Sequence, residues 1–255
     1  MGRAFFALML CLAGLSALPC SASAADAPKP VVLELFTSNS CEQCPPANEF
    51  MRRLQASPPP GIEPILLSEH VDYWNPYGWV DRYSSAQFTE RQKIYGWDNF
   101  QGKIYTPQLI IDGRRSTVGT WENDVHAAIR DLATQANRPV SIGFEPTQEQ
   151  MLAVQIDFAR APEDDLSQIW VALVQDNVVA KVDAGENGGR TLHEDGLVRT
   201  LIQARASGSD ATQATHYRAS LTLPSGVDRA DLAVVAFAQR ADNHAIVGAT
   251  RRPLR

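Results

Sequence analysis

Two cysteines separated by two residues, Cys41 and Cys44, carry the clearest chemistry in this sequence. At this spacing, one sulfur can act as the nucleophile of thiol–disulfide exchange and the other can resolve the mixed disulfide. The pair follows an apolar, β-rich segment at residues 31–37 and precedes a helical pattern at residues 47–55. Cys41 is therefore expected where a helix begins, and there backbone N–H groups and the helix dipole stabilise a thiolate.

The neighbouring segments determine what surrounds the pair. Hydrophobic periodicity predicts the order strand–helix–strand–helix–strand–strand–helix, with helices at 47–55, 84–95 and 121–134 and strands at 31–37, from 65, at 108–111 and at 114–118. A strand–helix–strand crossover is parallel, so the first two strands end at one sheet edge. Residues 69–74 are thus expected beside Cys41.

Several side chains at this edge have two interpretations. His70 could move protons during exchange, because histidine titrates near neutral pH, or it could hydrogen-bond a loop. Tyr73 and Trp74 could form a substrate wall, or they could pack the loop. Glu42, between the cysteines, would oppose a thiolate on Cys41 if its carboxylate lies close, and would have little effect if it is solvated.

The element order, with C-x-x-C at the first strand-to-helix turn, resembles the thioredoxin arrangement. In that arrangement, a proline before the third strand is usually cis and faces the cysteine pair. Thr106 and Pro107 stand directly before the apolar strand at 108–111. The resemblance therefore implies a cis bond at Pro107 as part of the catalytic site, with Thr106 contributing to substrate binding.

The pattern changes near residue 138. Beyond it, short runs of alternating apolar residues with turns between them predict an antiparallel, sandwich-like all-β domain. The expected fold is thus an α/β thioredoxin-like domain at 25–138, a mixed sheet with flanking helices, followed by a β-rich domain at 139–255. A glycine-rich loop at 185–190 lacks the residues of a phosphate-binding loop.

That loop is expected to order a long β-connection or to pack against the first half, over the cysteines. Arg190 and His193, at and just after its end, are candidates for structural or interdomain contacts.

The first 24 residues have the three-part pattern of a secretory signal peptide, with cleavage near Ala24. Their apolar run is shorter than a bilayer-spanning helix requires, and no other stretch is long and apolar enough. Cleavage would remove Cys11 and Cys20 and leave Cys41 and Cys44 in a periplasmic or secreted chain, where disulfides persist. The formal net charge of −6 argues against a nucleic-acid partner.

Several motifs resemble a bacterial secreted thioredoxin-like family catalogued as domain of unknown function twelve twenty-three. They lie in family order and span most of the chain: Glu34–Ser38, Cys41–Ala47, His70–Asn75, Gly78–Asp81, Thr106–Gln108 and Gly185–Leu192. The resemblance implies secretion and a thioredoxin-like domain with a β-rich extension.

Three functions compete. The leading hypothesis is a thiol–disulfide oxidoreductase that needs no organic cofactor, only a thiol or disulfide partner protein or a small thiol. The second is a non-enzymatic envelope-binding protein in which the cysteine pair is a structural disulfide. The third is copper or zinc binding by the two thiolates and a histidine such as His70, although a fourth ligand is not evident. The sequence sets neither the direction of exchange nor the oligomeric state.

Overall fold

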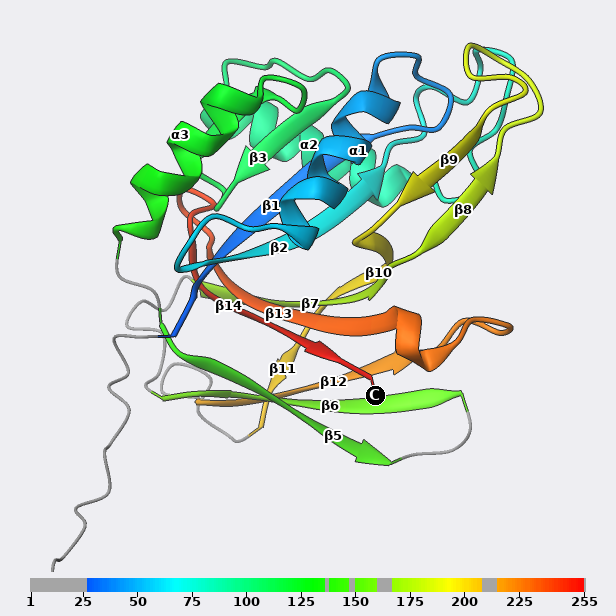
Figure 1. The fold of residues 1–255 in the computed structure, drawn as a ribbon. Helices are drawn as coiled ribbons and strands as arrows, with labels where there is room; N and C mark the ends of the chain where they lie inside the picture. Colours follow the sequence, from blue (N-terminus) through cyan, green and yellow to red (C-terminus); the bar gives the residue numbers. More distant parts are fainter. Residues whose placement is uncertain (1–26, 136–137, 147–149, 160–166, 208–214, 255) are drawn as a thin grey trace, which may run out of the picture.

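The computed structural model describes residues 27–135, 138–146, 150–159, 167–207 and 215–254 (Figure 1). The expected signal peptide and its cleavage near Ala24 lie outside the described residues. Within the described residues, no helix combines the length and apolarity needed to cross a membrane.

The first half contains the predicted elements in the predicted order. They are β1 (Lys29–Thr37), α1 (Cys44–Ala56), β2 (Ile62–His70), α2 (Ala86–Asn99), β3 (Gln108–Ile111), β4 (Arg115–Val118) and α3 (Glu122–Ala133). Ser85 caps α2, because its hydroxyl accepts a hydrogen bond from the Gln87 N–H at 3.2 Å.

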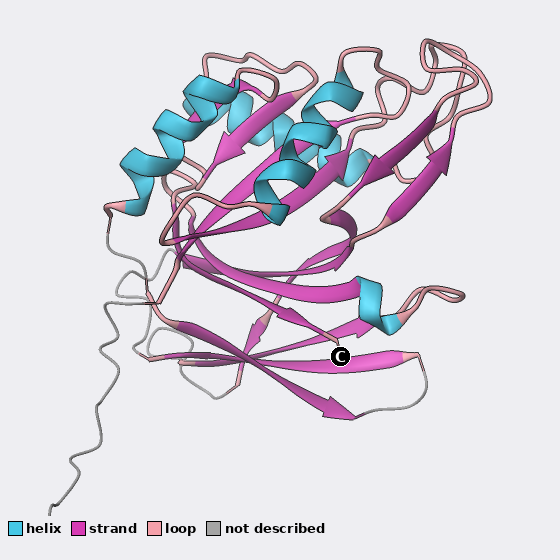
Figure 2. Ribbon diagram, in the orientation of Figure 1, coloured by secondary structure: helices cyan, strands magenta, loops and turns pink. Residues whose placement is uncertain are grey.

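The second half is built almost entirely of strands (Figure 2). They are β5 (Val140–Pro146), β6 (Met151–Phe158), β7 (Ser167–Gln175), β8 (Val178–Lys181), β9 (Thr191–Glu194), β10 (Leu197–Gln203), β11 (Arg205–Ala206), β12 (His216–Thr222), β13 (Leu232–Arg240) and β14 (Ile246–Pro253). A short 3-10 turn, η1 (Arg229–Asp231), precedes β13.

One eight-stranded mixed sheet runs through both halves, in the order β14-β13-β7-β10-β2-β1-β3-β4. β1 is parallel to β2 and antiparallel to β3, so the crossover through α1 is the expected one. The second half joins at β10, which lies parallel to β2 with Leu197 opposite Ser68. The expectation of a mixed α/β fold with additional antiparallel sheets is confirmed. However, the sheet continues across residue 138, where the sequence indicated separate domains.

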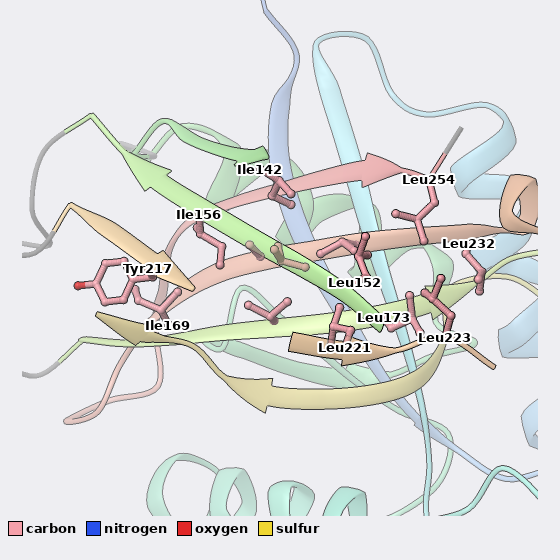
Figure 3. Packing of buried hydrophobic residues seen from close by; sticks show 14 of the residues in the cluster. Ile142, Leu152, Ile156, Ile169, Leu173, Tyr217, Leu221, Leu223, Leu232 and Leu254 are labelled. Atoms are coloured by element: carbon pink, nitrogen blue, oxygen red, sulfur yellow. The ribbon is translucent and has the colours of Figure 1, made fainter. Parts of the chain in front are cut away.

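Three hydrophobic layers hold the sheet. α1 and α3 pack on β1 and β3 through residues such as Leu33, Phe50 and Ile129. α2 contributes Phe88 to a layer that joins β1 and β2 to β7 and β13. A four-stranded antiparallel sheet, β11-β12-β6-β5, packs on β7 and β13 through Ile156, Leu173 and their neighbours (Figure 3). Burial of apolar surface in these layers is the main stabilising term.

A buried polar cluster ties α2 to the sheet. Glu34 of β1 accepts hydrogen bonds from Arg91 Nε at 2.7 Å and from the Tyr95 hydroxyl at 2.5 Å. Gln239 of β13 donates to the same hydroxyl at 2.6 Å. Burial and the neighbouring Glu34 raise the pKa of Glu69 well above its usual range. Glu34 and Glu69 are tolerated on the buried strands β1 and β2 because the positive charge of Arg91 lies beside both carboxyl groups.

The joint between β10 and β2 depends on Gly196. Its carbonyl accepts a hydrogen bond from the Ser68 N–H at 2.8 Å, and its φ of +67° lies in the left-handed region. A Cβ at this position would lie 2.6 Å from Leu66 Cβ and 2.8 Å from the Leu66 carbonyl oxygen. Only glycine fits so close to the neighbouring strand.

We predict that Gly196→Ala destabilises the protein by clearly more than the roughly 1–2 kcal/mol that a left-handed alanine costs by itself. Gly226→Ala is the matched control, because Gly226 has a φ of +72° and a Cβ added there would meet nothing within 4 Å. Urea unfolding of both variants measures the difference. Equal losses would show that the contact with Leu66 is not limiting.

Candidate active site

The cysteine pair lies where β1 gives way to α1. The Cys41 N–H donates to the Ser38 carbonyl at 3.2 Å, and the Cys44 N–H donates to the Cys41 carbonyl at 3.2 Å. Both side chains are free thiols. Cys44 is fully buried and Cys41 has 1% of its surface exposed. The turn therefore holds two adjacent thiols at a helix start, as the sequence indicates.

The two thiols differ strongly in acidity. A hydrogen bond from the Cys44 thiol, with help from the Gln43 and Cys44 backbone, lowers the pKa of Cys41 to about 7 although burial opposes this. Burial, and then the neighbouring Cys41, raises the pKa of Cys44 well above its usual range. Cys41 is thus the thiol that ionises first, and Cys44 is the donor that stabilises its thiolate.

The Thr106–Pro107 segment lies next to Cys41. The peptide bond between Thr106 and Pro107 is cis, which confirms the prediction from the sequence. Cys41 Sγ lies 4.0 Å from the Thr106 carbonyl oxygen. The Thr106 hydroxyl accepts a hydrogen bond from Trp74 Nε1 at 2.7 Å. The structure therefore brings Thr106, Pro107 and Trp74 close to Cys41.

A pocket of about 320 Å³ opens beside Cys41. Tyr73, Trp74, Tyr105 and Thr106 line it, together with residues of the cysteine turn. The Tyr73 hydroxyl donates to Gln92 Oε1 at 3.2 Å, and burial raises the pKa of Tyr73. Tyr73 and Trp74 thus pack against the hydrophobic cluster of this region and also line the pocket, while their role as a substrate wall stays a prediction.

His70 is not among the residues that line this pocket. Its Nδ1 is 2.6 Å from Asp81 Oδ2 and its Nε2 is 2.7 Å from Glu194 Oε2, and all three side chains are fully buried. Burial disfavours the charged imidazole, but the two carboxylates outweigh it and raise the pKa of His70 well above its usual range. The pKa of Asp81 falls to about 2, since attraction to His70 outweighs burial. The proposed catalytic role of His70 stays a prediction. Because His70 binds Asp81 and Glu194 from two other segments, we call these three residues the clamp.

The glycine-rich loop at 185–190 covers the cysteine turn from the second half. Asn187 is fully buried, and its Nδ2 donates to the carbonyls of Asn39 at 2.9 Å and of Cys41 at 2.8 Å. Glu186 Oε2 accepts from the Glu42 N–H at 2.9 Å. Figure 1 shows the β8–β9 hairpin that carries this loop rising beside α1.

Arg190 and His193 both face the first half. Arg190 Nη1 donates to Asn187 Oδ1 at 2.7 Å, so it supports the residue that anchors the loop. Both residues line a second pocket of about 260 Å³, together with Pro45 and Pro46 of α1. The Arg190 hydrogen bond lies within the second half, while the shared pocket brings both residues next to α1. Their structural or interdomain role stays a prediction.

Four residues of the site were not predicted individually from the sequence: Asp81, Glu186, Asn187 and Glu194. Three of them lie inside motifs of the family resemblance, which was the signal that could have found them. Glu194 lies on β9 and carries no local signal, because a glutamate in a short strand usually faces solvent.

Metal binding finds little support in the side-chain arrangement. His70, one of the histidines that this alternative considers as a third ligand, has both ring nitrogens hydrogen-bonded to carboxylates. Over the part of the chain that the structure describes, no three His, Cys, Asp or Glu side chains are grouped to hold an ion.

The fold and this site define a mixed α/β protein with a buried cysteine pair beside a cis-proline. The chain belongs to the family described as "Protein of unknown function (DUF1223)", whose model matches residues 32–239. This confirms the family resemblance, and no curated protein matches the chain.

Two solved structures are similar over most of the chain. One is the crystal structure of an Agrobacterium tumefaciens protein from a structural genomics consortium, with 26% identity, a TM-score of 0.62, and coverage of 91% of this chain and 97% of that one. The other is HBP35 of Porphyromonas gingivalis, with 16% identity, a TM-score of 0.60, and coverage of 89% and 76%. The second likeness concerns the fold alone.

We predict that His70→Gln lowers the free energy of unfolding by about 3–5 kcal/mol, because it leaves two buried carboxylates without their cation. His216→Gln is the control, since His216 pairs with Asp157 at the surface with 68% of its side chain exposed, and should cost less than about 1 kcal/mol. Denaturant unfolding at about pH 6.5, the usual pKa of histidine, compares them. Similar losses would show that the buried clamp contributes no more than a surface pair.

The clamp also predicts a pH dependence. The folded-state pKa of His70 is raised above its unfolded value of about 6.5. Its contribution is therefore complete below that pH and declines as pH rises toward the raised pKa. The stability difference between wild type and His70→Gln should shrink above about pH 6.5, by up to about 1.4 kcal/mol per pH unit. A difference that stays constant to about pH 8.5 would contradict a charged His70.

For the reduced protein, we predict that alkylation of Cys41 by iodoacetamide has its half-maximal rate near pH 7, its pKa being about 7. Cys44→Ala, which removes the donor, should move this midpoint upward, toward the usual value of about 8.5, because the thiol hydrogen bond is the largest cause of the lowered pKa. Mass spectrometry gives the rate at each pH. A midpoint that does not move would rule out Cys44 as the cause.

Proposed function

We propose that this protein is a periplasmic or secreted thiol–disulfide oxidoreductase, with Cys41 as nucleophile and Cys44 as resolving thiol. The observation that carries the proposal is the placement of the two thiols at the start of α1, where Cys41 lines the pocket beside Tyr73 and Trp74 and Cys44 is not among the residues that line it. Cys41 has a pKa of about 7 and borders a pocket, whereas Cys44 is buried with a raised pKa. A pair that divides nucleophile and resolving roles needs this asymmetry.

In the reducing direction, the Cys41 thiolate attacks one sulfur of a substrate disulfide. A bond forms between Cys41 and that sulfur, and the other substrate sulfur leaves as a thiolate. Cys44 then gives up its proton and attacks Cys41, which forms the Cys41–Cys44 disulfide and releases the second substrate thiolate. The protein loses two electrons and two protons, and the substrate gains them. A dithiol or thiol partner protein restores the reduced pair, and the oxidising direction is the reverse.

We further propose a thioredoxin-like fold for residues 25–138. The order of elements, the parallel β1–β2 pair, the antiparallel β1–β3 pair and the cis bond at Pro107 all support it. Export is supported by the signal-peptide pattern of residues 1–24.

One observation favours the alternative of an envelope-binding protein with a structural disulfide. Cys41 is only 1% exposed and the loop at 185–190 covers its turn. A substrate sulfur would have to approach through the pocket beside Tyr73 and Trp74. The two functions therefore differ in whether Sγ of Cys41 can be reached.

A redox titration separates them. The protein is equilibrated with glutathione or dithiol buffers, and the fraction of the Cys41–Cys44 disulfide is measured by mass spectrometry, with Cys41→Ser as control. We expect a potential between about −120 and −270 mV, the range of catalytic pairs. A potential below about −300 mV, or no mixed disulfide with a protein substrate, would overturn the proposal in favour of a structural bond.

A further inference from the structure

The pocket beside Cys41 combines aromatic and acidic walls. Tyr73, Trp74 and Tyr105 provide the aromatic surface, and Glu42 and Glu186 provide two carboxylates. The residues that line it, all within the described chain, include no lysine, arginine or histidine. An approaching substrate therefore meets negative charge next to the nucleophile.

Glu186 is held at this position by the fold. Its carboxylate accepts the Glu42 N–H at 2.9 Å. Asn187, the next residue, is fully buried and binds the Asn39 and Cys41 carbonyls. Gly185, the residue before Glu186, packs against the 77–79 segment, where an added Cβ would lie 3.2 Å from Trp79 Cβ. The second half of the chain thus delivers a carboxylate to the cysteine turn.

The aromatic wall continues outward from the pocket. The rings of Trp74 and Tyr77 lie 5.4 Å apart, and Tyr77 is 64% exposed. Carboxylates beside exposed aromatic faces are the surroundings that favour lysine and arginine side chains, through charge-assisted hydrogen bonds and cation–π contacts. Anionic groups are disfavoured at the same place.

The basic side chains at the end of the glycine-rich loop and just after it lie elsewhere. Arg190 and His193 line the separate pocket between α1 and β9. Arg190 donates to Asn187 Oδ1 and is not among the residues that line the pocket beside Cys41. The charge that a substrate meets at Cys41 is set by Glu42 and Glu186.

We propose that the substrate of this site is a peptide or protein segment with a basic residue adjacent to its reactive cysteine, and that glutathione, with its two carboxylates, is a poor substrate. This rests on the proposed exchange reaction and names its substrate class. The exchange itself is the two-electron step given above, with the basic residue placed between the carboxylates and the aromatic wall.

The test uses disulfide-linked dimers of two short peptides, Gly-Lys-Cys-Lys-Gly and Gly-Glu-Cys-Glu-Gly, with blocked ends. Rate constants for reduction by the reduced protein are divided by those for dithiothreitol, which removes the intrinsic difference between the peptides. We expect about a tenfold preference for the lysine peptide at low salt, weakening as salt is added. Glu42→Gln combined with Glu186→Gln should abolish most of it.

Glu49→Gln is the matched control, because Glu49 lines the other pocket and pairs with Arg52. It should keep the preference. Equal normalised rates in the wild type, or an unchanged preference in the double variant, would overturn the substrate class while leaving exchange intact.

A binding measurement separates this failure from failure of the proposed function. Cys41→Ser/Cys44→Ser protein is titrated with the same peptides carrying serine in place of cysteine, followed by tryptophan fluorescence. Tighter binding of the lysine peptide, lost in the double glutamine variant, supports the substrate class even if no disulfide exchanges. If neither charge binds better, the substrate class is wrong whatever the redox result.

Discussion

The cysteine edge of this protein depends on one buried cation held between two carboxylates. His70 ends β2, Asp81 comes from the segment before α2, and Glu194 comes from β9 of the second half. A charge taken out of water must be paired closely, so these three segments cannot separate without exposing an uncompensated charge. Asp81 also accepts the Asn39 N–H at 2.7 Å, which extends the constraint to the residues just before Cys41. The clamp therefore links the segment just before Cys41 to the β8–β9 hairpin.

Because the hairpin is fixed, its loop becomes part of the site. Asn187, a residue of the second half, donates to two backbone carbonyls of the cysteine turn. Loss of this buried amide would remove a donor from the Asn39 carbonyl and would leave the Cys41 carbonyl with the Cys44 N–H, and removing a donor from a buried carbonyl is costly. The turn that positions Cys41 is thus shaped by a residue nearly one hundred and fifty positions away in the chain. This long-range contact therefore helps to set the access to Cys41 and the charge beside it.

Sequence patterns predicted the site where local rules govern it. Apolar periodicity located β1, α1 and β3, and the C-x-x-C spacing located the thiols, because these depend on near neighbours. The crossover rule correctly placed Tyr73 and Trp74 beside Cys41. The pairing of β10 with β2 was not predictable in this way, since it requires a glycine with left-handed φ against Leu66. Likewise, the sequence gives no sign that Glu194 is buried, because its contact with His70 forms only in the folded chain.

These long-range contacts also show that the first half depends on the second for its hydrogen bonds. The edge of β2 that β10 covers would present unpaired backbone groups if the second half were absent. His70 would keep Asp81 but lose Glu194, and the Tyr95 hydroxyl would lose Gln239. Each loss falls on a polar group that lies in the interior, where unmet hydrogen bonds are costly. The β-rich half is therefore more than an appended module, because it completes both the sheet and the surroundings of the thiol that the first half supplies.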